Sequence, residues 1–155
     1  MHPANHLGYM LNHVASVMAK QADQILQERL DIGLSQFKIL MVLQKNENVQ
    51  QRFIADSLGQ TEASISRQIQ LLQDKGLLTS KRDPKNLRQH ITVPTATGFQ
   101  LTKTAMQVLA ELMDPALAQM GQMAFMQLLD NLQQLHEIVC QPGKTGACDH
   151  HFKAT

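Results

Sequence analysis

Cysteine is scarce in this chain of 155 residues, tryptophan is absent, and aromatic residues make up only 4%. The two cysteines, Cys140 and Cys148, are too few for a disulfide framework. A chain of this length can bury a core without disulfides or metals to hold it together. We therefore expect one domain whose apolar mass is aliphatic and includes nine methionines, a composition that suits helices.

Long hydrophobic runs are also missing. No apolar stretch approaches the length that spans a bilayer, and the first residues lack the charged start and apolar run of a signal peptide. The chain shows no nucleophile–base pair, no glycine-rich phosphate loop and no paired acid motif. We therefore expect a soluble cytoplasmic protein that has no membrane partner and is not an enzyme.

Charge is nearly balanced, because the formal net charge is only +1, but its distribution is uneven. Residues 61–90 hold six lysines or arginines against three acidic residues, whereas residues 91–140 hold one against four. The positive charge is therefore local, as it is in proteins that contact nucleic acid through one segment.

The first third of the chain predicts two helices. Apolar residues recur every three to five positions over residues 5–30, which is typical of a long amphipathic helix. Ser35 is a candidate N-cap for a second helix, whose apolar side chains we expect to face the core. Residues 45–48 predict a polar loop.

Two further helices are predicted around a tight turn. The first starts near Gln50 and ends at Gly59, because glycine tolerates the left-handed conformation at a helix C-terminus. Thr61 can cap the second, which stops at Gly76. Its apolar positions share one face, which we expect to be buried: Ile65, Ile69 and Leu72. The opposite face carries the polar side chains of Glu62, Ser66, Arg67, Gln70 and Gln73.

A basic hairpin follows the second of these helices. An extended strand begins at Leu77, residues 83–86 have turn chemistry, and residues 88–93 alternate as a returning strand would. The hairpin is flanked by the cations Lys81, Arg82, Lys85 and Arg88. A helix, a tight turn, a helix and a basic wing form a winged helix-turn-helix, whose second helix enters the major groove of DNA.

Two long helices are predicted after the hairpin. Thr95 can cap the first, which we expect to end at Asp114-Pro115, with Asp114 as N-cap and Pro115 in the first turn of the last helix. That last helix is apolar on two faces, which a monomer satisfies with difficulty. We therefore interpret the excess apolar surface as a partner surface.

This order of elements resembles the multiple-antibiotic-resistance regulator (MarR) family from about Leu7 to Val139. The resemblance rests on Leu-Gln-Asp-Lys-Gly-Leu-Leu at residues 72–78, on Arg88 followed by Thr95, and on Thr-Ala-Thr-Gly at residues 95–98. It implies a mainly α fold with a small β-hairpin wing. Residues 5–139 would form a single MarR-like domain, with residues 35–94 as the winged lobe, residues 5–30 and 95–139 as dimerisation helices, and residues 140–155 as a tail.

The resemblance also implies a homodimer that binds a pseudo-palindromic operator in double-stranded DNA, in most members as a repressor. In members of the family, repression is relieved by small phenolic or lipophilic effectors, by oxidants or by metals. No bound cofactor is expected here. Carried over to this sequence, the resemblance places base contacts on Ser64, Ser66, Arg67 and Gln70 and a wing contact on Arg88. The full set of predicted DNA-binding residues is Thr61, Ser64, Ser66, Arg67, Gln70, Lys81, Arg82, Lys85 and Arg88.

Three positions depart from the family pattern. Asn86 stands where the family usually has an aspartate that orients the wing arginine, a role that Asp83 could take over. Leu71 stands where members often have an arginine, which would remove one phosphate contact. Pro94 replaces a leucine, a change that we expect only to end the strand.

Simpler interpretations exist for each pattern. The polar helix face could be a solvated surface, and the wing cations could only keep a hairpin soluble. The winged fold could also be a protein-interaction module, an antirepressor or an adaptor, without specific DNA binding. The combination of a helix-turn-helix with a basic wing favours DNA.

The tail holds metal-competent side chains, Cys140, Cys148, His150 and His151, whose spacing matches no standard zinc motif. We favour a disordered tail, and a redox switch or a metal site is the alternative hypothesis. His6 and His13, seven residues apart on one helix face, would lie about 10 Å apart, too far to share one ion without a partner chain.

Overall fold

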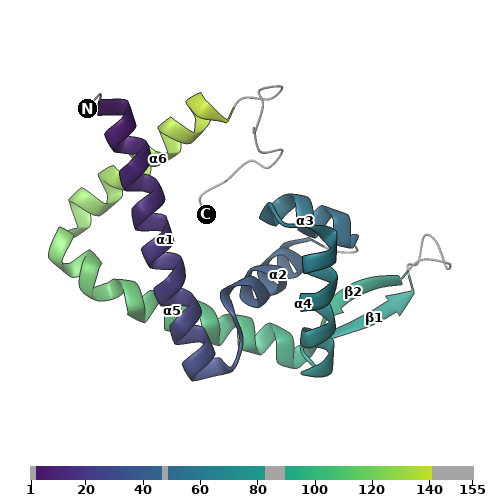
Figure 1. Cartoon of the computed structure of the whole chain (residues 1–155). Helices are drawn as coiled ribbons and strands as arrows, with labels where there is room; N and C mark the ends of the chain where they lie inside the picture. The colour runs from purple at the N-terminus through teal and green to yellow at the C-terminus, as the bar shows by residue number, and fades with distance from the viewer. Residues whose placement is uncertain (1–2, 47–48, 83–89, 141–155) are drawn as a thin grey trace. The chain divides into compact units, whose positions relative to one another are not determined.

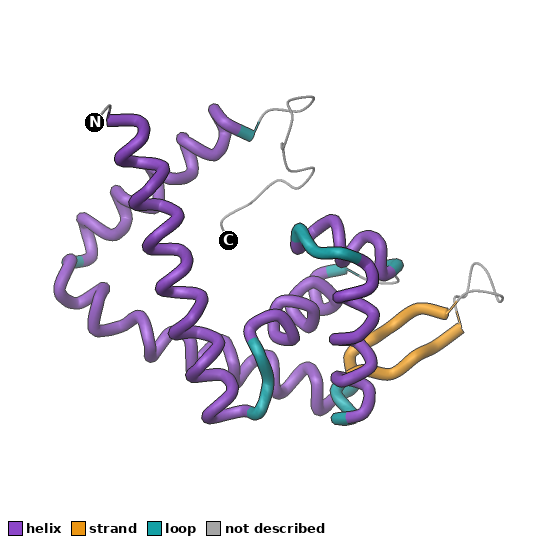
Figure 2. The backbone as a smooth tube through the Cα atoms, in the orientation of Figure 1, coloured by secondary structure: helices purple, strands orange, loops and turns teal. Residues whose placement is uncertain are grey.

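The structure of the chain, a computed structural model, describes residues 3–46, 49–82 and 90–140. The elements follow in the order α1 (Pro3–Leu30), α2 (Leu34–Lys45), α3 (Gln51–Leu58), α4 (Glu62–Asp74), β1 (Leu78–Arg82), β2 (His90–Pro94), α5 (Ala96–Met120) and α6 (Gln122–Val139). Figure 2 shows the two strands as one antiparallel hairpin in an otherwise helical chain. The predicted fold class is confirmed. Among the described helices, none is long and apolar enough to cross a membrane.

The chain divides into two compact units between Leu112 and Met113. The first unit contains α1 to α4, the hairpin and most of α5, and the second contains the end of α5 and all of α6.

The core of the first unit lies where α2, α3 and α4 pack together, beside the hairpin (Figure 1). Its buried side chains come mainly from these three helices: Phe37, Ile39, Leu40, Leu43, Ile54, Ala55, Ile65, Ile69 and Leu72. Full burial of one such aliphatic side chain stabilises the fold by about 1.5–3 kcal/mol. Because a helix of 8 residues such as α3 is too short to be stable alone, this packing holds it in place.

The start of α2 differs from the prediction. Gly33 is the N-cap, so the predicted N-cap at Ser35 is wrong. The acceptors come from elsewhere: the Leu34 N–H donates to Asp23 Oδ1 of α1 at 2.7 Å, and the Gly33 N–H donates to Gln36 Oε1 at 3.2 Å. Since these side chains satisfy the first amides of α2, the Ser35 hydroxyl is left to bond elsewhere.

The boundary predicted at Asp114-Pro115 is also wrong, because α5 continues through Pro115 to Met120. A proline inside a helix removes one hydrogen bond, but Leu112, Met113, Ala116 and Leu117 around it are good helix formers. The chain breaks instead at Gly121, whose φ of 83° is strained for any residue with a Cβ. The predicted last helix is therefore shorter and begins at Gln122.

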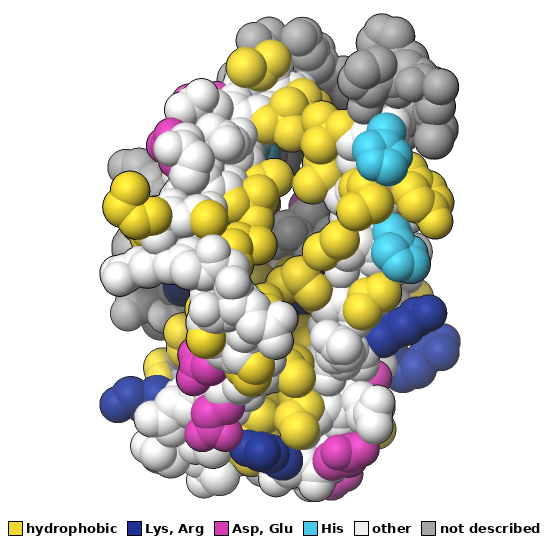
Figure 3. All heavy atoms as spheres, turned by 90° about the vertical axis from the view of Figure 1, so that its left-hand side faces the viewer, with side chains coloured by type: hydrophobic (Ala, Val, Ile, Leu, Met, Phe, Trp, Pro, Cys, Tyr) yellow, Lys and Arg dark blue, Asp and Glu magenta, His cyan; other side chains and the backbone are white. Residues whose placement is uncertain are grey.

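Two helices keep much of their apolar surface exposed. The exposed large hydrophobic residues of α1 all lie in its N-terminal part: Leu7, Tyr9, Met10, Leu11, Val14, Val17 and Met18. Helix α6 contains no buried residue and exposes Met123, Met126, Leu128, Leu129, Ile138 and Val139. Figure 3 shows hydrophobic side chains of these helices as yellow spheres on the surface.

Candidate nucleic-acid interface

The turn between α3 and α4 is fixed by backbone bonds. Gly59 has a left-handed conformation, with φ 62°, and its N–H reaches the Asp56 carbonyl at 3.3 Å. The next amide, of Gln60, donates to the Ala55 carbonyl at 3.0 Å. Thr61 then caps α4, because its Oγ1 accepts a bond from the Ser64 N–H at 3.2 Å. The predicted helix stop at Gly59 and the predicted cap at Thr61 are both confirmed.

Helix α4 has the two faces that the sequence predicts. Ile65, Ile69 and Leu72 are buried to 2% exposure or less, so they anchor the helix on the core. Ser66, Arg67 and Gln70 are exposed on the other side. The buried face holds the helix rigidly, and the polar face is left free to meet a ligand.

Ser64 differs from the other predicted contacts on α4. It is half-buried, and its hydroxyl lies 3.4 Å from Gln60 Oε1, to which it donates. Gln60 Nε2 in turn donates to Ser35 Oγ of α2 at 3.1 Å. This small network joins the first turn of α4 to the first turn of α2. No local pattern predicts it, because Ser35 and Gln60 lie 25 residues apart.

Gln70 is partly engaged within its own helix. Its Nε2 donates to Asp74 Oδ1 at 2.9 Å, one helical turn later. One amide hydrogen and the amide oxygen of Gln70 remain available. Exposed pairs of this kind contribute only about 0.2–0.5 kcal/mol, so a base edge could displace the Asp74 carboxylate.

The hairpin presents positive charge next to α4. Strand β1 packs against α4 and pairs with β2 in an antiparallel register that runs from Leu78 opposite Pro94 to Arg82 opposite His90. Leu78 and Ile91 are buried, whereas Lys81 and Arg82 are exposed. The predicted wing residues Lys85 and Arg88 lie outside the described residues.

Thr95 ties the hairpin to α4 and α5. Its Oγ1 donates to the Gly76 carbonyl at 2.8 Å and accepts from the Gly98 N–H at 3.0 Å. Its N–H donates to the Leu77 carbonyl at 3.0 Å. The predicted cap at Thr95 is confirmed. The same hydroxyl also bonds a carbonyl just after the end of α4. Strand β2 ends at Pro94, as predicted.

The interface therefore combines a polar helix face with nearby cations. Arg67, Lys81 and Arg82 have no acidic partner among the residues that the structure describes. Side chains of this kind bond to phosphate oxygens and to the edges of bases.

Comparison with known proteins gives a family match that includes α4 and β1. The model of the MarR family matches residues 30–89, which include α2, α3, α4 and β1. The predicted resemblance to the MarR family is confirmed. No curated protein matches the chain in sequence.

Several solved structures share the fold. The transcriptional regulator BldR of Sulfolobus solfataricus has a TM-score of 0.73 and 22% identity, with 90% of this chain and 100% of that chain covered. CouR of Rhodococcus jostii RHA1, bound to p-coumaroyl-CoA, has a TM-score of 0.70 and 20% identity, covering 85% and 92%. MepR of S. aureus in complex with DNA has a TM-score of 0.66 and 23% identity, covering 83% and 92%.

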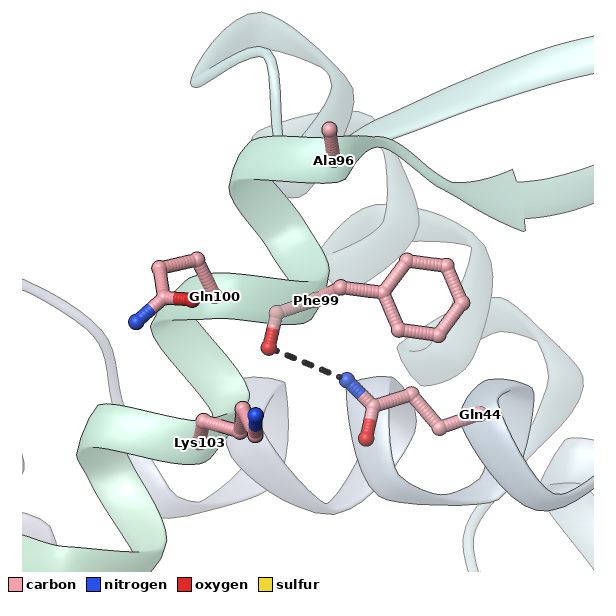
Figure 4. Close-up of a pocket in the computed structure, with 5 residues that line it drawn as sticks. All are labelled: Gln44, Ala96, Phe99, Gln100 and Lys103. Atoms are coloured by element: carbon pink, nitrogen blue, oxygen red, sulfur yellow. Dashed lines mark hydrogen bonds between the residues drawn. The ribbon is translucent and has the colours of Figure 1, made fainter.

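The MarR-like lobe also carries a solvent-open hollow of about 500 Å³ between α2 and α5, shown in Figure 4. It is lined by Gln44, Ala96, Phe99, Gln100 and Lys103. Gln44 Nε2 donates to the Phe99 carbonyl at 3.4 Å, so the amide bridges the two helices. An exposed aromatic ring, two amides and one ammonium group are chemically suited to a small acidic aromatic molecule.

Of the metal-competent residues of the tail, Cys140 lies within the described residues. Cys140 is half-buried at the end of α6. Cys148, His150 and His151 lie outside the described residues. Among the residues that are described, no three histidine, cysteine or acidic side chains group into a metal site.

Proposed function

We propose that this chain is a MarR-type transcriptional regulator that binds double-stranded DNA as a homodimer through α4 and the wing. One observation carries the proposal. Helix α4 is anchored by three buried side chains and presents Ser66, Arg67 and Gln70 to solvent. It lies beside a hairpin with two exposed cations that have no acidic partner among the described residues.

The dimensions of α4 suit the major groove. A helix of 13 residues is about 20 Å long, and the major groove of B-DNA, about 12 Å wide, admits one α-helix. Arg67 can bond the O6 and N7 atoms of a guanine, and Gln70 can bond an adenine. Lys81 and Arg82 would meet the phosphates that flank the groove.

The apolar surface of α1 and α6 supports the homodimer. A soluble monomer rarely leaves large contiguous apolar surface exposed, and α6 in particular has no buried side chain of its own. A second copy of the chain would cover these faces. Two lobes would then read two half-sites about 34 Å apart.

Repression and a response to a small effector belong to the same proposal. CouR, which shares the fold, contains p-coumaroyl-CoA in its solved structure. The hollow next to Phe99 and Lys103 is the place where we expect a small lipophilic or phenolic molecule to bind this chain. Thermal-shift screening of phenolic acids, with Phe99→Ala as the matched variant, tests this part separately.

The decisive experiment is a selection from a pool of random-sequence duplexes, followed by fluorescence anisotropy on the selected duplex. Arg67→Ala should weaken binding by about 1–3 kcal/mol if Arg67 contacts a base, and it should relax the sequence preference at that position. Lys45→Ala removes one exposed positive charge at the end of α2, outside the proposed reading face and the proposed dimer surface, and is the control, for which we expect little change. If both variants lost the same affinity for the duplex, α4 would not be the helix that recognises the base sequence.

The rival function is a protein-interaction module that uses the same winged fold. It predicts no detectable duplex binding even at low salt.

A redox or metal role of the tail is a separate hypothesis. Metal analysis and thiol titration of the purified protein would end it if no metal bound and both cysteines stayed free after mild oxidation.

A further inference from the structure

Asp31 has an unusual backbone conformation at the corner between α1 and α2. Its φ of 52° makes it the one non-glycine residue with positive φ among the residues that the structure describes. Aspartate tolerates this left-handed conformation better than most side chains, but glycine would adopt it without strain. The identity of the side chain at this corner therefore calls for an explanation.

Lys75 supplies that explanation. Lys75 is the C-cap of α4, and its Nζ donates to Asp31 Oδ2 at 2.9 Å and also to the Asp31 carbonyl oxygen. The two residues are 44 positions apart in the sequence. Asp31 thus offers two acceptors to a single ammonium group, and the left-handed turn places both on the same side.

The corner that receives Lys75 is itself fixed. The Asp31 N–H donates to the Gln27 carbonyl at 3.1 Å, which closes the end of α1. Asp23 of α1 accepts from the Leu34 N–H of α2, and Arg29 of α1 pairs with Glu111 of α5 at 2.7 Å. The ion pair from Lys75 therefore joins the end of α4 to a fixed corner directly after α1, the helix that carries exposed apolar surface.

We propose that Asp31 and Lys75 form a latch that sets the orientation of α4 on DNA relative to α1. The inference rests on the proposed function, because it treats α4 as the reading helix and α1 as part of the dimer interface. Lys75 is then a positioning residue that makes no contact with DNA. In a dimer, two such latches would fix the distance and the orientation between the two copies of α4.

The competing explanation is that Lys75 leaves Asp31 and binds a phosphate. The two explanations predict opposite signs for Asp31→Asn. Removing a negative charge from a DNA-binding lobe strengthens attraction to phosphates, so electrostatics alone predicts tighter binding. Loss of the latch predicts weaker binding, because the asparagine keeps the left-handed corner but cannot form the ion pair.

The test compares Asp31→Asn, Lys75→Met and the double variant on a duplex that the parent protein selects from a random-sequence pool. Exposed ion pairs change an equilibrium by up to about fivefold, so a roughly threefold loss per lobe becomes about tenfold for two half-sites. We expect each single variant to show this loss, the double variant to lose no more than either, and the salt dependence to stay that of the parent.

Three binding results would overturn the latch. The first is tighter binding by Asp31→Asn. The second is a slope of log K against log salt that is smaller by about 1.8 in Lys75→Met, the change expected when one lysine in each of two half-sites no longer neutralises a phosphate. Unchanged affinity in the fully folded single variants would also overturn it, because the ion pair would then only stabilise the fold. Asp56→Asn, which removes an exposed acid of α3, is the charge control and should not weaken binding.

A second measurement separates the latch from the proposed function. The Gly76 and Leu77 amides donate to the Gln73 and Leu72 carbonyls at the end of α4. We expect these amides to exchange with solvent faster in both single variants, and parental exchange rates would overturn the latch. If the parent selects no duplex, the proposed function fails, and amide exchange alone decides whether Lys75 holds the end of α4.

Discussion

Gly98→Ala is the substitution for which the structure predicts the clearest defect. Gly98 is buried in the first turn of α5, and a Cβ added there would lie 2.1 Å from the Leu77 carbonyl oxygen. Carbon and oxygen atoms normally approach no closer than about 3.3 Å, so α5 and the end of α4 would have to separate by about 1 Å. The clash is with backbone atoms, which have no rotamer to relieve it.

The size of the effect follows from the bonds that such a shift would break. The Thr95 N–H donates to the Leu77 carbonyl, and Thr95 Oγ1 donates to the Gly76 carbonyl. Each bond contributes about 0.5–1.5 kcal/mol, and overpacking adds about 1–3 kcal/mol. The higher helix propensity of alanine offsets about 1 kcal/mol. We therefore expect the free energy of unfolding to fall by about 1–5 kcal/mol.

Urea denaturation at one fixed protein concentration measures this loss, with Ser66→Ala as the control. Ser66 is exposed on α4, outside the proposed dimer surface. The control should therefore gain about 0.5 kcal/mol from the higher helix propensity of alanine. If Gly98→Ala were as stable as the parent or more stable, α5 would not pack on the Leu77 backbone as described.

Three further predictions concern α4 and the wing. Thr61→Ala removes the cap of α4 and should lower the free energy of unfolding by about 1 kcal/mol, whereas an unchanged urea midpoint would deny Thr61 this role. Leu71→Arg places a cation on the exposed surface of α4, where Leu71 is 43% exposed. It should tighten duplex binding and steepen the salt dependence by about 0.9 in slope per half-site, about 1.8 for the dimer, and weaker binding would count against a phosphate nearby. Arg88→Ala should weaken operator binding by about 1–3 kcal/mol in an anisotropy titration, and parental affinity would remove the wing tip from the mechanism.

Much of the lobe was predictable because its element boundaries depend on local chemistry. Gly59 and Gly76 have positive φ, and Thr61 and Thr95 cap the helices that follow them, as their residue types indicate. The spacing of Ile65, Ile69 and Leu72 also determined which face of α4 is buried. The exposed positions of Ser66, Arg67 and Gln70 follow from the same spacing.

The wrong predictions concern the start of α2 and the boundary between α5 and α6. There, residues distant in sequence or a glycine further along the chain determined where the helix begins or ends. Asp23 lies 11 residues before Leu34, so no local pattern showed that it would bond the start of α2 in place of Ser35. At Pro115, a local rule predicted a helix start, but Gly121 offered a less strained break six residues later. The bonds of Lys75 with Asp31 and of Gln60 with Ser35 join residues far apart in the sequence, and only the fold reveals them.

The most direct test of the central claim is a hydroxyl-radical footprint of the full chain on a duplex selected from random sequences at low salt. If α4 reads the major groove in a dimer, two protected half-sites should appear about one helical turn apart, and protection should weaken steeply as salt rises. Selection of no duplex, or uniform protection without a preferred sequence, would contradict the claim.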